Sequence, residues 1–315
     1  AKTKILALRR TLAGVLGDAG PLWVVPTRML RRKNLAEAIL LTRWLRPEAW
    51  LVTTAGVSSQ DERSYARRLE GAARRGAWKV RFGILHGRGH SLATIDEVVA
   101  AAEVLLFTSL QEGFGLPFVE AAAAGKPLIA RRLPRVIPDM EALGLKFPQL
   151  YEEILIPKNL FDWSGEEKRQ RTLWRNWKAT LPASCRRKGA GIRVCDQGAE
   201  IPVPFSRLTL TAQLEVLARP VEESWSASLS LNPHLRRWRI RAAAEGLTPS
   251  VWSAVAEARM GEAAFVRRFQ AAARHAARIP QKNLVSATVA RSLQADFITR
   301  RLATECLYPI LMGDA

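Results

Sequence analysis

The chain has 315 residues, 48% hydrophobic and 24% charged, a composition that excludes a disordered or collagen-like chain. It carries 48 Lys and Arg against 29 Asp and Glu, a net charge of +19. This charge makes nucleic acid and an anionic membrane surface candidate partners. Because the cations are spread over both halves of the chain, we interpret most of them as general surface charge and regard nucleic acid as the least favoured partner.

The cysteines and the hydropathy of the chain bear on its location. The three cysteines, at positions 185, 195 and 306, cannot form a disulfide framework and lack zinc-knuckle spacing, so we expect a reducing, cytoplasmic setting. No apolar run reaches the roughly 18 residues of a membrane span, and the N-terminus lacks a signal-peptide pattern. The first residue is Ala1 rather than Met, which leaves open a processed or partial chain.

Short apolar segments alternate with amphipathic segments of helical length through the first half of the chain. We expect strands at 22–26, 50–54, 79–85, 104–108 and 127–130, with helices between them at 34–45, 60–75, 94–102 and 117–125. This alternation predicts an α/β fold with a doubly wound parallel sheet, a Rossmann-like domain over 21–165 that follows a short linker or helix at 1–20. Ligands of such sheets bind at the carboxyl ends of strands, so the candidate binding loops are 26–33, 84–93 and 108–117.

The pattern changes after about residue 165. Residues 166–180 are polar and helical, residues 182–204 show little periodicity, and helical patterns return at 209–218, 249–260, 262–277 and 286–306. We therefore expect a mainly helical extension over 166–315. Within it, the run Arg236–Arg241 alternates basic and apolar residues, so it is either a solvated surface or a peripheral contact with an anionic membrane.

Two familiar nucleotide-binding motifs are incomplete. The run 86–90 contains Gly-x-Gly, but Leu92 stands at the third glycine position of a dinucleotide fingerprint. Gly125 and the lysine after it resemble the end of a phosphate-binding P-loop, but Pro127 replaces the required Ser or Thr. The sequence also lacks an Asp-x-Asp pair, so we expect no metal site.

One glycine-containing turn is better suited to an anion. In the segment SLQEGFGLPFVEAAAAGKP, a strand leads into a turn and a helix starts near Pro117, where proline is well tolerated. Gly113 and Gly115 let the chain fold closely, and the free N–H groups at the helix start would bind a diphosphate.

Charged side chains flank this turn. Glu112 precedes it and Glu120 follows one helical turn later, and ionised carboxylates accept hydrogen bonds from the vicinal hydroxyls of a sugar or ribose. Arg28 and Lys33 follow the first predicted strand and are expected at the same edge of the sheet. Two fixed cations there would neutralise a departing diphosphate without a metal ion.

These residues carry a family resemblance. Residues 21–165 resemble the C-terminal, donor-binding half of family 4 glycosyltransferases of the GT-B type, the "glycosyl transferases group 1" domain. The resemblance rests on an E-x7-E motif from Glu112 to Glu120 and an R-x4-K element from Arg28 to Lys33. It implies a retaining, metal-independent transfer of a hexose-like sugar from a nucleoside-diphosphate sugar to an acceptor hydroxyl, with that donor as substrate and no cofactor.

The resemblance also assigns roles to single residues. Arg28 and Lys33 would contact the donor diphosphate, Glu112 the transferred sugar, and Glu120 the ribose hydroxyls. The backbone of the turn would contact the sugar and the phosphates, at Gly113, Phe114, Gly115 and Leu116. The nucleobase would lie near residues 82–84.

The chain departs from the family pattern in two ways. Thr27 stands where the family usually has Gly before the Arg, and only about twenty residues precede the first strand. We therefore expect the acceptor-binding half to come from a missing N-terminal domain or a partner chain. The alternative hypothesis is a non-catalytic module that binds nucleotide sugars without transferring them.

Overall fold

The structure is a computed structural model that describes residues 2–85, 93–183, 186, 202–276 and 307–312. The expected histidine-containing part of the 84–93 loop, the three cysteines and the helix expected at 286–306 lie outside the described residues.

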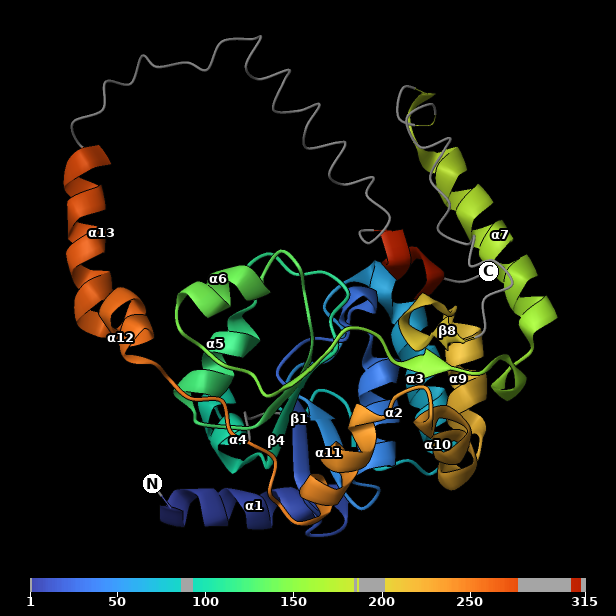
Figure 1. The fold of residues 1–315 in the computed structure, drawn as a ribbon, viewed down its shortest axis with the longest axis horizontal. Helices are drawn as coiled ribbons and strands as arrows, with labels where there is room; N and C mark the ends of the chain where they lie inside the picture. Colours follow the sequence, from blue (N-terminus) through green and yellow to red (C-terminus); the bar gives the residue numbers. More distant parts are fainter. Residues whose placement is uncertain (1, 86–92, 184–185, 187–201, 277–306, 313–315) are drawn as a thin grey trace.

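The sheet lies at the centre of the molecule (Figure 1). It has six parallel strands in the spatial order β3-β2-β1-β4-β5-β6. They are β1 Leu22–Val25, β2 Trp50–Thr53, β3 Val80–Arg81, β4 Val104–Phe107, β5 Leu128–Arg131 and β6 Gln149–Tyr151. This confirms the predicted doubly wound parallel sheet. The order reverses between β1 and β4, so the loops that follow these two strands diverge from a common point where such sheets bind ligands.

Side chains alternate between two hydrophobic layers along each central strand. Trp23 and Val25 of β1 face one layer, whereas Leu22 and Val24 face the other. The first layer is covered by α2 Leu35–Leu45 and α3 Arg63–Arg75, and the second by α1 Lys2–Leu16, α4 Ile95–Ala101, α5 Leu116–Ala123 and α6 Ile137–Ala142. Because both faces are covered, the strands read as continuous apolar runs.

Three helices of the expected extension share a core with the sheet. They are α9 Leu210–Ala218, α10 Val221–Leu229 and α11 His234–Ala243, and they pack around α2. Trp44 of α2 stacks edge-on against Trp225 and donates a 3.0 Å hydrogen bond to Ser224. The sequence pattern did not separate α10 and α11 from their surroundings.

The basic run in α11 follows helical rather than alternating geometry. Leu235, Trp238 and Ala242 are spaced so that they share one helix face, and all three are buried. This leaves Ile240, 66% exposed, as the apolar side chain that the run presents to solvent. The aromatic residue that would anchor this surface to a membrane is therefore in the core.

Several element boundaries differ from the predictions. The helix expected at 249–260 begins only at α12 Ala254–Met260, because Pro249 and Val251 form antiparallel bridges with Pro127 and Lys146. In the helix expected at 60–75, the first three residues form a separate 3-10 turn, η2 Gln60–Glu62, before α3. The strand β6 and the helix α6 were not predicted. The remaining elements are β7 Leu155–Ile156, β8 Val203–Pro204, α7 Trp163–Thr180, α13 Glu262–Ala276 and the 3-10 helix η5 Tyr308–Met312, which packs against α7.

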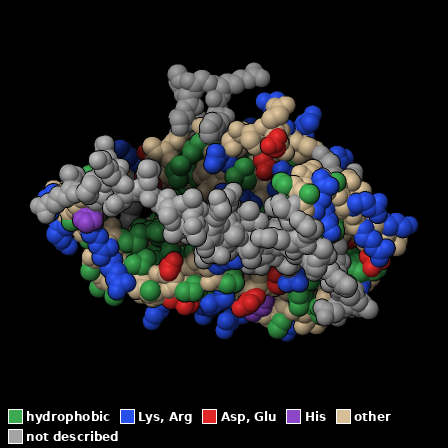
Figure 2. Space-filling view, turned by 90° about the horizontal axis from the view of Figure 1, so that it is seen from above, with side chains coloured by type: hydrophobic (Ala, Val, Ile, Leu, Met, Phe, Trp, Pro, Cys, Tyr) green, Lys and Arg blue, Asp and Glu red, His purple; other side chains and the backbone are tan. Residues whose placement is uncertain are grey.

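Basic side chains are visible on the face of the molecule seen from above (Figure 2). Within the described ranges, no helix is long and apolar enough to cross a membrane. The cytoplasmic setting and the domain limits stay predictions.

A buried ion pair ties α2 to the far strands of the sheet. Arg131 at the end of β5 donates to both carboxylate oxygens of Glu37, at 2.6 and 2.7 Å, and Tyr151 of β6 donates to the same carboxylate at 2.6 Å. The side chain of Glu37 is fully buried and that of Arg131 is 6% exposed. A buried charge of this kind requires its partner, because an unpaired ion in the interior is strongly unfavourable.

We predict that Arg131→Met lowers the free energy of unfolding by about 3–5 kcal/mol, because it leaves the Glu37 carboxylate buried without a cation. Urea denaturation followed by circular dichroism measures the change. The neighbouring Arg132→Met is the matched control: Arg132 is 41% exposed and forms only long ion pairs, so we expect a change within about 0.5 kcal/mol. Equal effects of the two substitutions would contradict the prediction.

Candidate functional site

The loops that follow β1 and β4 are joined by hydrogen bonds to main-chain carbonyl groups. The hydroxyl of buried Thr108 donates to the carbonyl oxygens of Lys33, at 2.9 Å, and Asn34, at 3.1 Å. The N–H of Leu110 donates to the carbonyl of Arg32 at 2.8 Å. These bonds fix the 3-10 turn η1, Arg31–Lys33, against the end of β4, at the point where the strand order reverses.

Asn34 makes the tight connection between η1 and α2. Its φ of 49° and ψ of 52° are left-handed, a conformation that Asn tolerates better than most residues other than Gly. Its carbonyl accepts the first hydrogen bond of the following helix, from the N–H of Glu37 at 3.0 Å. The preceding residue, Lys33, is thereby held at a sharp change of chain direction.

Lys33 and Glu112 form a buried ion pair across the two loops. The distance from Lys33 Nζ to Glu112 Oε1 is 2.5 Å, and both side chains are 9% exposed. Arg32 Nη1 lies 3.0 Å from the same carboxylate oxygen, and the Lys33 ammonium lies 5.4 Å from the ring centre of Phe107. One carboxylate is thus compensated by two cations.

This pairing changes the ionisation of both groups. Burial lowers the pKa of Lys33 below its ordinary value, although the hydrogen bond and charge of Glu112 oppose the shift. Burial acts to raise the pKa of Glu112, but the hydrogen bond and charge of Lys33, with the charge of Arg32, outweigh it and the pKa falls below its ordinary value. The Glu112 carboxyl group is therefore ionised at neutral pH.

Arg28 lies at the exposed side of the same loop. Its Nη1 is 3.4 Å from the hydroxyl of Ser58, and the N–H of the next residue, Met29, donates to the carbonyl of Gly56 at 3.1 Å. The Arg28 charge contributes to lowering the pKa of Lys33, so the two cations lie within electrostatic range of each other.

The turn before α5 presents unused backbone donors. Gly113 is exposed, and Phe114 and Leu116 are 53% and 56% exposed. Within the described part of the chain, no carbonyl accepts a hydrogen bond from the N–H groups of residues 113–116. Gly115 has a φ of 83°, and a Cβ at this position would lie 2.4 Å from Cγ1 of Val136. Only glycine therefore fits at the start of this helix.

Glu120 is the fourth charged residue of the predicted set. Burial raises the pKa of its carboxyl group, the charge of Asp96 raises it further, and the charge of Lys33 opposes both. Glu120 therefore lies within electrostatic range of Lys33 without a direct contact. The structure brings Lys33 and Glu112 into contact and places Arg28 and Glu120 around them.

The sequence interpretation missed part of this arrangement. It assigned Lys33 and Glu112 to different parts of a ligand, whereas they pair directly with each other. It also overlooked Arg32 and Thr108. Arg32 was masked by its place in a basic run, and Thr108 could have been found from its position at the carboxyl end of a central strand.

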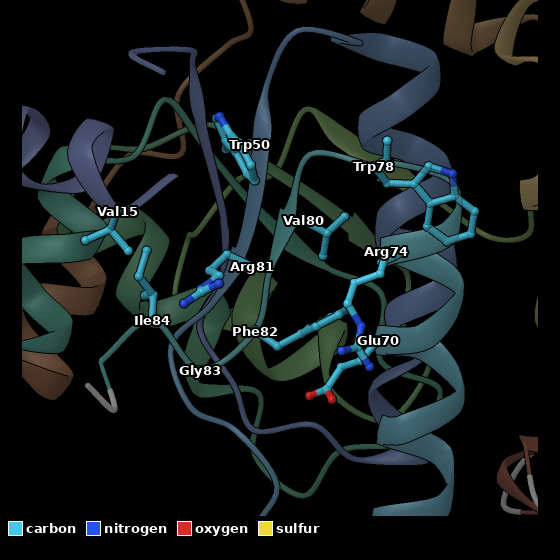
Figure 3. A pocket seen from close by; sticks show the side chains of 12 residues that line it. Val15, Trp50, Glu70, Arg74, Trp78, Val80, Arg81, Phe82, Gly83 and Ile84 are labelled. Carbon is cyan, nitrogen blue, oxygen red and sulfur yellow. The ribbon is translucent and has the colours of Figure 1, made fainter. Parts of the chain in front are cut away.

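A groove of about 700 Å³ lies beside the open edge of the sheet at β3. Residues 82–84, where the nucleobase was expected, contribute to its lining. Figure 3 shows Phe82 on the side of Arg74 and Glu70, whereas Arg81 points toward Ile84. Lys33 and Glu112 do not line this groove.

Among the described residues, no group of three or more His, Cys, Asp or Glu is placed to hold a metal ion.

Part of the first half of the chain is similar to known proteins. Residues 30–156 match the family "Glycosyl transferases group 1". The chain is 29% identical over 135 residues to mannosylglucosyl-3-phosphoglycerate synthase of Petrotoga mobilis, which covers 42% of this chain and 25% of that protein. It is 46% identical over 70 residues to MMP alpha-(1->4)-mannosyltransferase of Mycolicibacterium hassiacum, which covers 21% of this chain and 17% of that protein. The chain thus matches a quarter or less of the length of these curated relatives.

Solved structures give a looser similarity. The C-terminal domain of a glycosyl transferase group 1 family protein from Francisella tularensis has a TM-score of 0.31 and 21% identity, over 35% of this chain and 57% of that domain. Anabaena HepE in complex with UDP-glucose has a TM-score of 0.36 and 17% identity, over 73% of this chain and 52% of HepE. Both TM-scores lie below 0.5.

The family match includes the central ion pair. Lys33, Glu112 and Glu120 lie inside the matched range 30–156, and Arg28 lies two positions before its first residue. The chain therefore carries a region, residues 30–156, that matches a glycosyl transferases group 1 domain.

We predict that Gly115→Ala lowers the free energy of unfolding by about 1–3 kcal/mol, because a Cβ would be strained at positive φ and would press on Val136. Gly113→Ala is the matched control in the same turn, since a Cβ there meets no atom within 4 Å. We expect the control to change stability by no more than about 0.5 kcal/mol, measured by thermal and urea unfolding. A neutral Gly115→Ala would show that this turn is not held as described.

We predict opposite pH-dependent effects of Glu112→Gln and Glu120→Gln. The pKa of Glu112 lies below its ordinary 4.5, so its ionised form stabilises the fold above that pH, and this contribution is lost as the pH falls through the folded-state value. Glu112→Gln is expected to be less stable than wild type at neutral pH, with a difference that shrinks in acid.

The matched substitution at Glu120 has the reverse sign. The pKa of Glu120 lies above 4.5, so its ionisation opposes folding at neutral pH, and Glu120→Gln is expected to equal or exceed wild-type stability there. Urea unfolding at neutral pH and at about pH 3.5 measures both series. Parallel pH profiles for the two variants would refute the assigned shifts.

Proposed function

We propose that the chain binds a nucleoside-diphosphate sugar at the strand reversal and takes part in transfer of its sugar to an acceptor hydroxyl. One observation carries this proposal: the buried Lys33–Glu112 pair lies beside a turn with free N–H groups, inside the region that matches the glycosyltransferase family. A diphosphate needs fixed positive charge and N–H donors, and this arrangement offers both.

In the proposed reaction, the bond between the sugar C1 and the diphosphate oxygen breaks, and its electron pair leaves with the diphosphate. The acceptor hydroxyl oxygen forms the new bond to C1, and its proton passes to the departing diphosphate. Lys33 and Arg28 would stabilise the charge that develops on the diphosphate, with the backbone of residues 113–116 as additional donors. Glu112 would hold the sugar hydroxyls, so the donor would share the carboxylate with Lys33.

Finer properties of the proposal rest on the family resemblance. We propose a family 4, GT-B type donor-binding half that retains the anomeric configuration, requires no metal ion or cofactor, and uses Glu120 for the ribose. The acceptor side of the cleft would come from another domain or a partner chain. We also propose a cytoplasmic setting, because the three cysteines of the chain fit a reducing environment. Retention is testable by NMR of the product, and metal independence by transfer rates in EDTA and in added Mg²⁺.

The central experiment compares Lys33→Ala with Lys168→Ala. Calorimetric titration with UDP-, GDP- and ADP-glucose is expected to show one preferred donor, with affinity weakened at least about tenfold by Lys33→Ala, since a buried charged donor to the diphosphate is lost. Lys168 is exposed on α7, away from the strand reversal, so the control retains wild-type affinity. Unchanged affinity in Lys33→Ala would contradict the assigned site.

Transfer and donor hydrolysis distinguish catalysis from binding alone. If the chain transfers or hydrolyses the preferred donor, Lys33→Ala is expected to slow that reaction, because the transition state loses about 2–4 kcal/mol of stabilisation. Tight donor binding without either reaction, also in the presence of the acceptor-binding half, would instead identify a non-catalytic nucleotide-sugar module.

A further inference from the structure

The Glu112 carboxylate holds two cations that are fixed in different ways. Lys33 Nζ lies 2.5 Å and Arg32 Nη1 lies 3.0 Å from the same oxygen, Glu112 Oε1. Arg32 Nη1 also donates to the main-chain carbonyl of Gln111 at 3.0 Å. Within the described part of the chain, the Lys33 ammonium donates to Glu112 and to no other acceptor. Arg32 is therefore anchored to the loop that carries Glu112, whereas Lys33 is hydrogen-bonded to the carboxylate alone.

The Lys33–Glu112 pair competes with the proposed ligand. Under the proposed function Lys33 binds the donor diphosphate, so its ammonium must share the carboxylate or leave it. The Glu112 side chain is only 9% exposed, and a carboxylate this far from water is strongly disfavoured once its cation is gone. A site with Lys33 as the single counter-ion of Glu112 would therefore resist the diphosphate.

Arg32 removes this competition. Its guanidinium carries several N–H donors in a rigid fork, so it can bond the Gln111 carbonyl and the Glu112 carboxylate together. Both of these partners lie on the loop after β4, so Arg32 can stay in place when the Lys33 ammonium moves. The charge of Arg32 also acts to lower the pKa of Lys33, which means that the two cations repel each other at the shared oxygen.

We propose that Arg32 is a positioning residue for the diphosphate: it is the standing counter-ion of Glu112 and thereby frees Lys33 for the ligand. This role rests on the proposed function and adds a residue to it. Arg32 acts through Glu112 and Lys33, and the ligand need not touch it.

Arg31 is the matched control in the same turn. Its side chain is 33% exposed, close to the 37% of Arg32, but its Nε lies 3.3 Å from Glu62 Oε2 in η2. Its charge is therefore paired with a carboxylate other than Glu112. Arg31→Gln and Arg32→Gln each remove one positive charge, so a difference between them cannot come from the net charge of the chain.

The test is calorimetric titration of the full chain with UDP, GDP and ADP. These nucleotides carry no transferable sugar, so Glu112 has no sugar hydroxyls to bind and the diphosphate is measured by itself. For the nucleotide that binds best, we expect Arg32→Gln to weaken affinity at least about tenfold and Arg31→Gln by less than about threefold. Circular dichroism checks that both variants are folded.

Glu112→Gln shows whether Arg32 acts through the carboxylate. Without that charge Lys33 has no competing partner, so Glu112→Gln is expected to bind the nucleotide at least as tightly as wild type. Adding Arg32→Gln to Glu112→Gln is expected to change affinity by less than about threefold, because the effect of Arg32 requires the carboxylate. A purely structural role of Arg32 would weaken binding in both backgrounds.

Three outcomes would overturn the role of Arg32. They are unchanged affinity in Arg32→Gln, equal losses in Arg31→Gln and Arg32→Gln, and an undiminished loss when Arg32→Gln is added to Glu112→Gln. The last outcome would mean that Arg32 supports binding without the carboxylate, by direct contact with the diphosphate or by holding the turn.

Lys33→Ala in the same titrations separates this role from the proposed function. If Lys33→Ala weakens binding at least about tenfold while Arg32→Gln does not, the donor site stands and only the role of Arg32 falls. If Lys33→Ala binds as wild type does, or if the wild-type chain binds none of the three nucleotides, the proposed function falls and the role of Arg32 falls with it.

Discussion

The charge of Lys33 is almost excluded from water, and this constraint organises the candidate site. A buried ammonium needs a partner, and the one available comes from a different loop, Glu112. The pair can form only because strands β1 and β4 are neighbours in the sheet. Thr108 strengthens that adjacency by donating one hydroxyl hydrogen to the carbonyls at the end of η1, so backbone and side chains fix the same geometry.

The charge balance around this pair supports the proposed binding of an anion. Three cations, Arg28, Arg32 and Lys33, surround the Glu112 carboxylate, whereas Glu120 is affected by the charge of Asp96, and the shifts in the pKa of Glu112 and Glu120 differ in sign. The carboxylate that touches Lys33 is held ionised, whereas the more distant one is disfavoured by burial. A diphosphate would add negative charge where positive charge is in excess, and the free N–H groups of the turn would complete its coordination.

Helices with similar sequence periodicity differ in whether their apolar faces are buried. α11 buries Leu235 and Trp238 against the core around α2, whereas α13 leaves Phe265 and Phe269 in solvent. The pattern that predicts an amphipathic helix states that a face will be covered, not what covers it. For α11 the cover is the protein itself, whereas the described residues provide none for most of α13.

The sequence by itself determined the alternation of strands and helices, the glycine turn before α5 and the residues that carry charge near it. Those features are local, since a buried strand, a helix start and a positive-φ glycine are encoded in a few neighbouring positions. Only the tertiary structure decided that Lys33 pairs with Glu112, that Arg131 is buried on Glu37, and that α9 to α11 belong to the same core as the sheet. These contacts join residues 79 and more positions apart, and their partners depend on strand order, which no local pattern specifies.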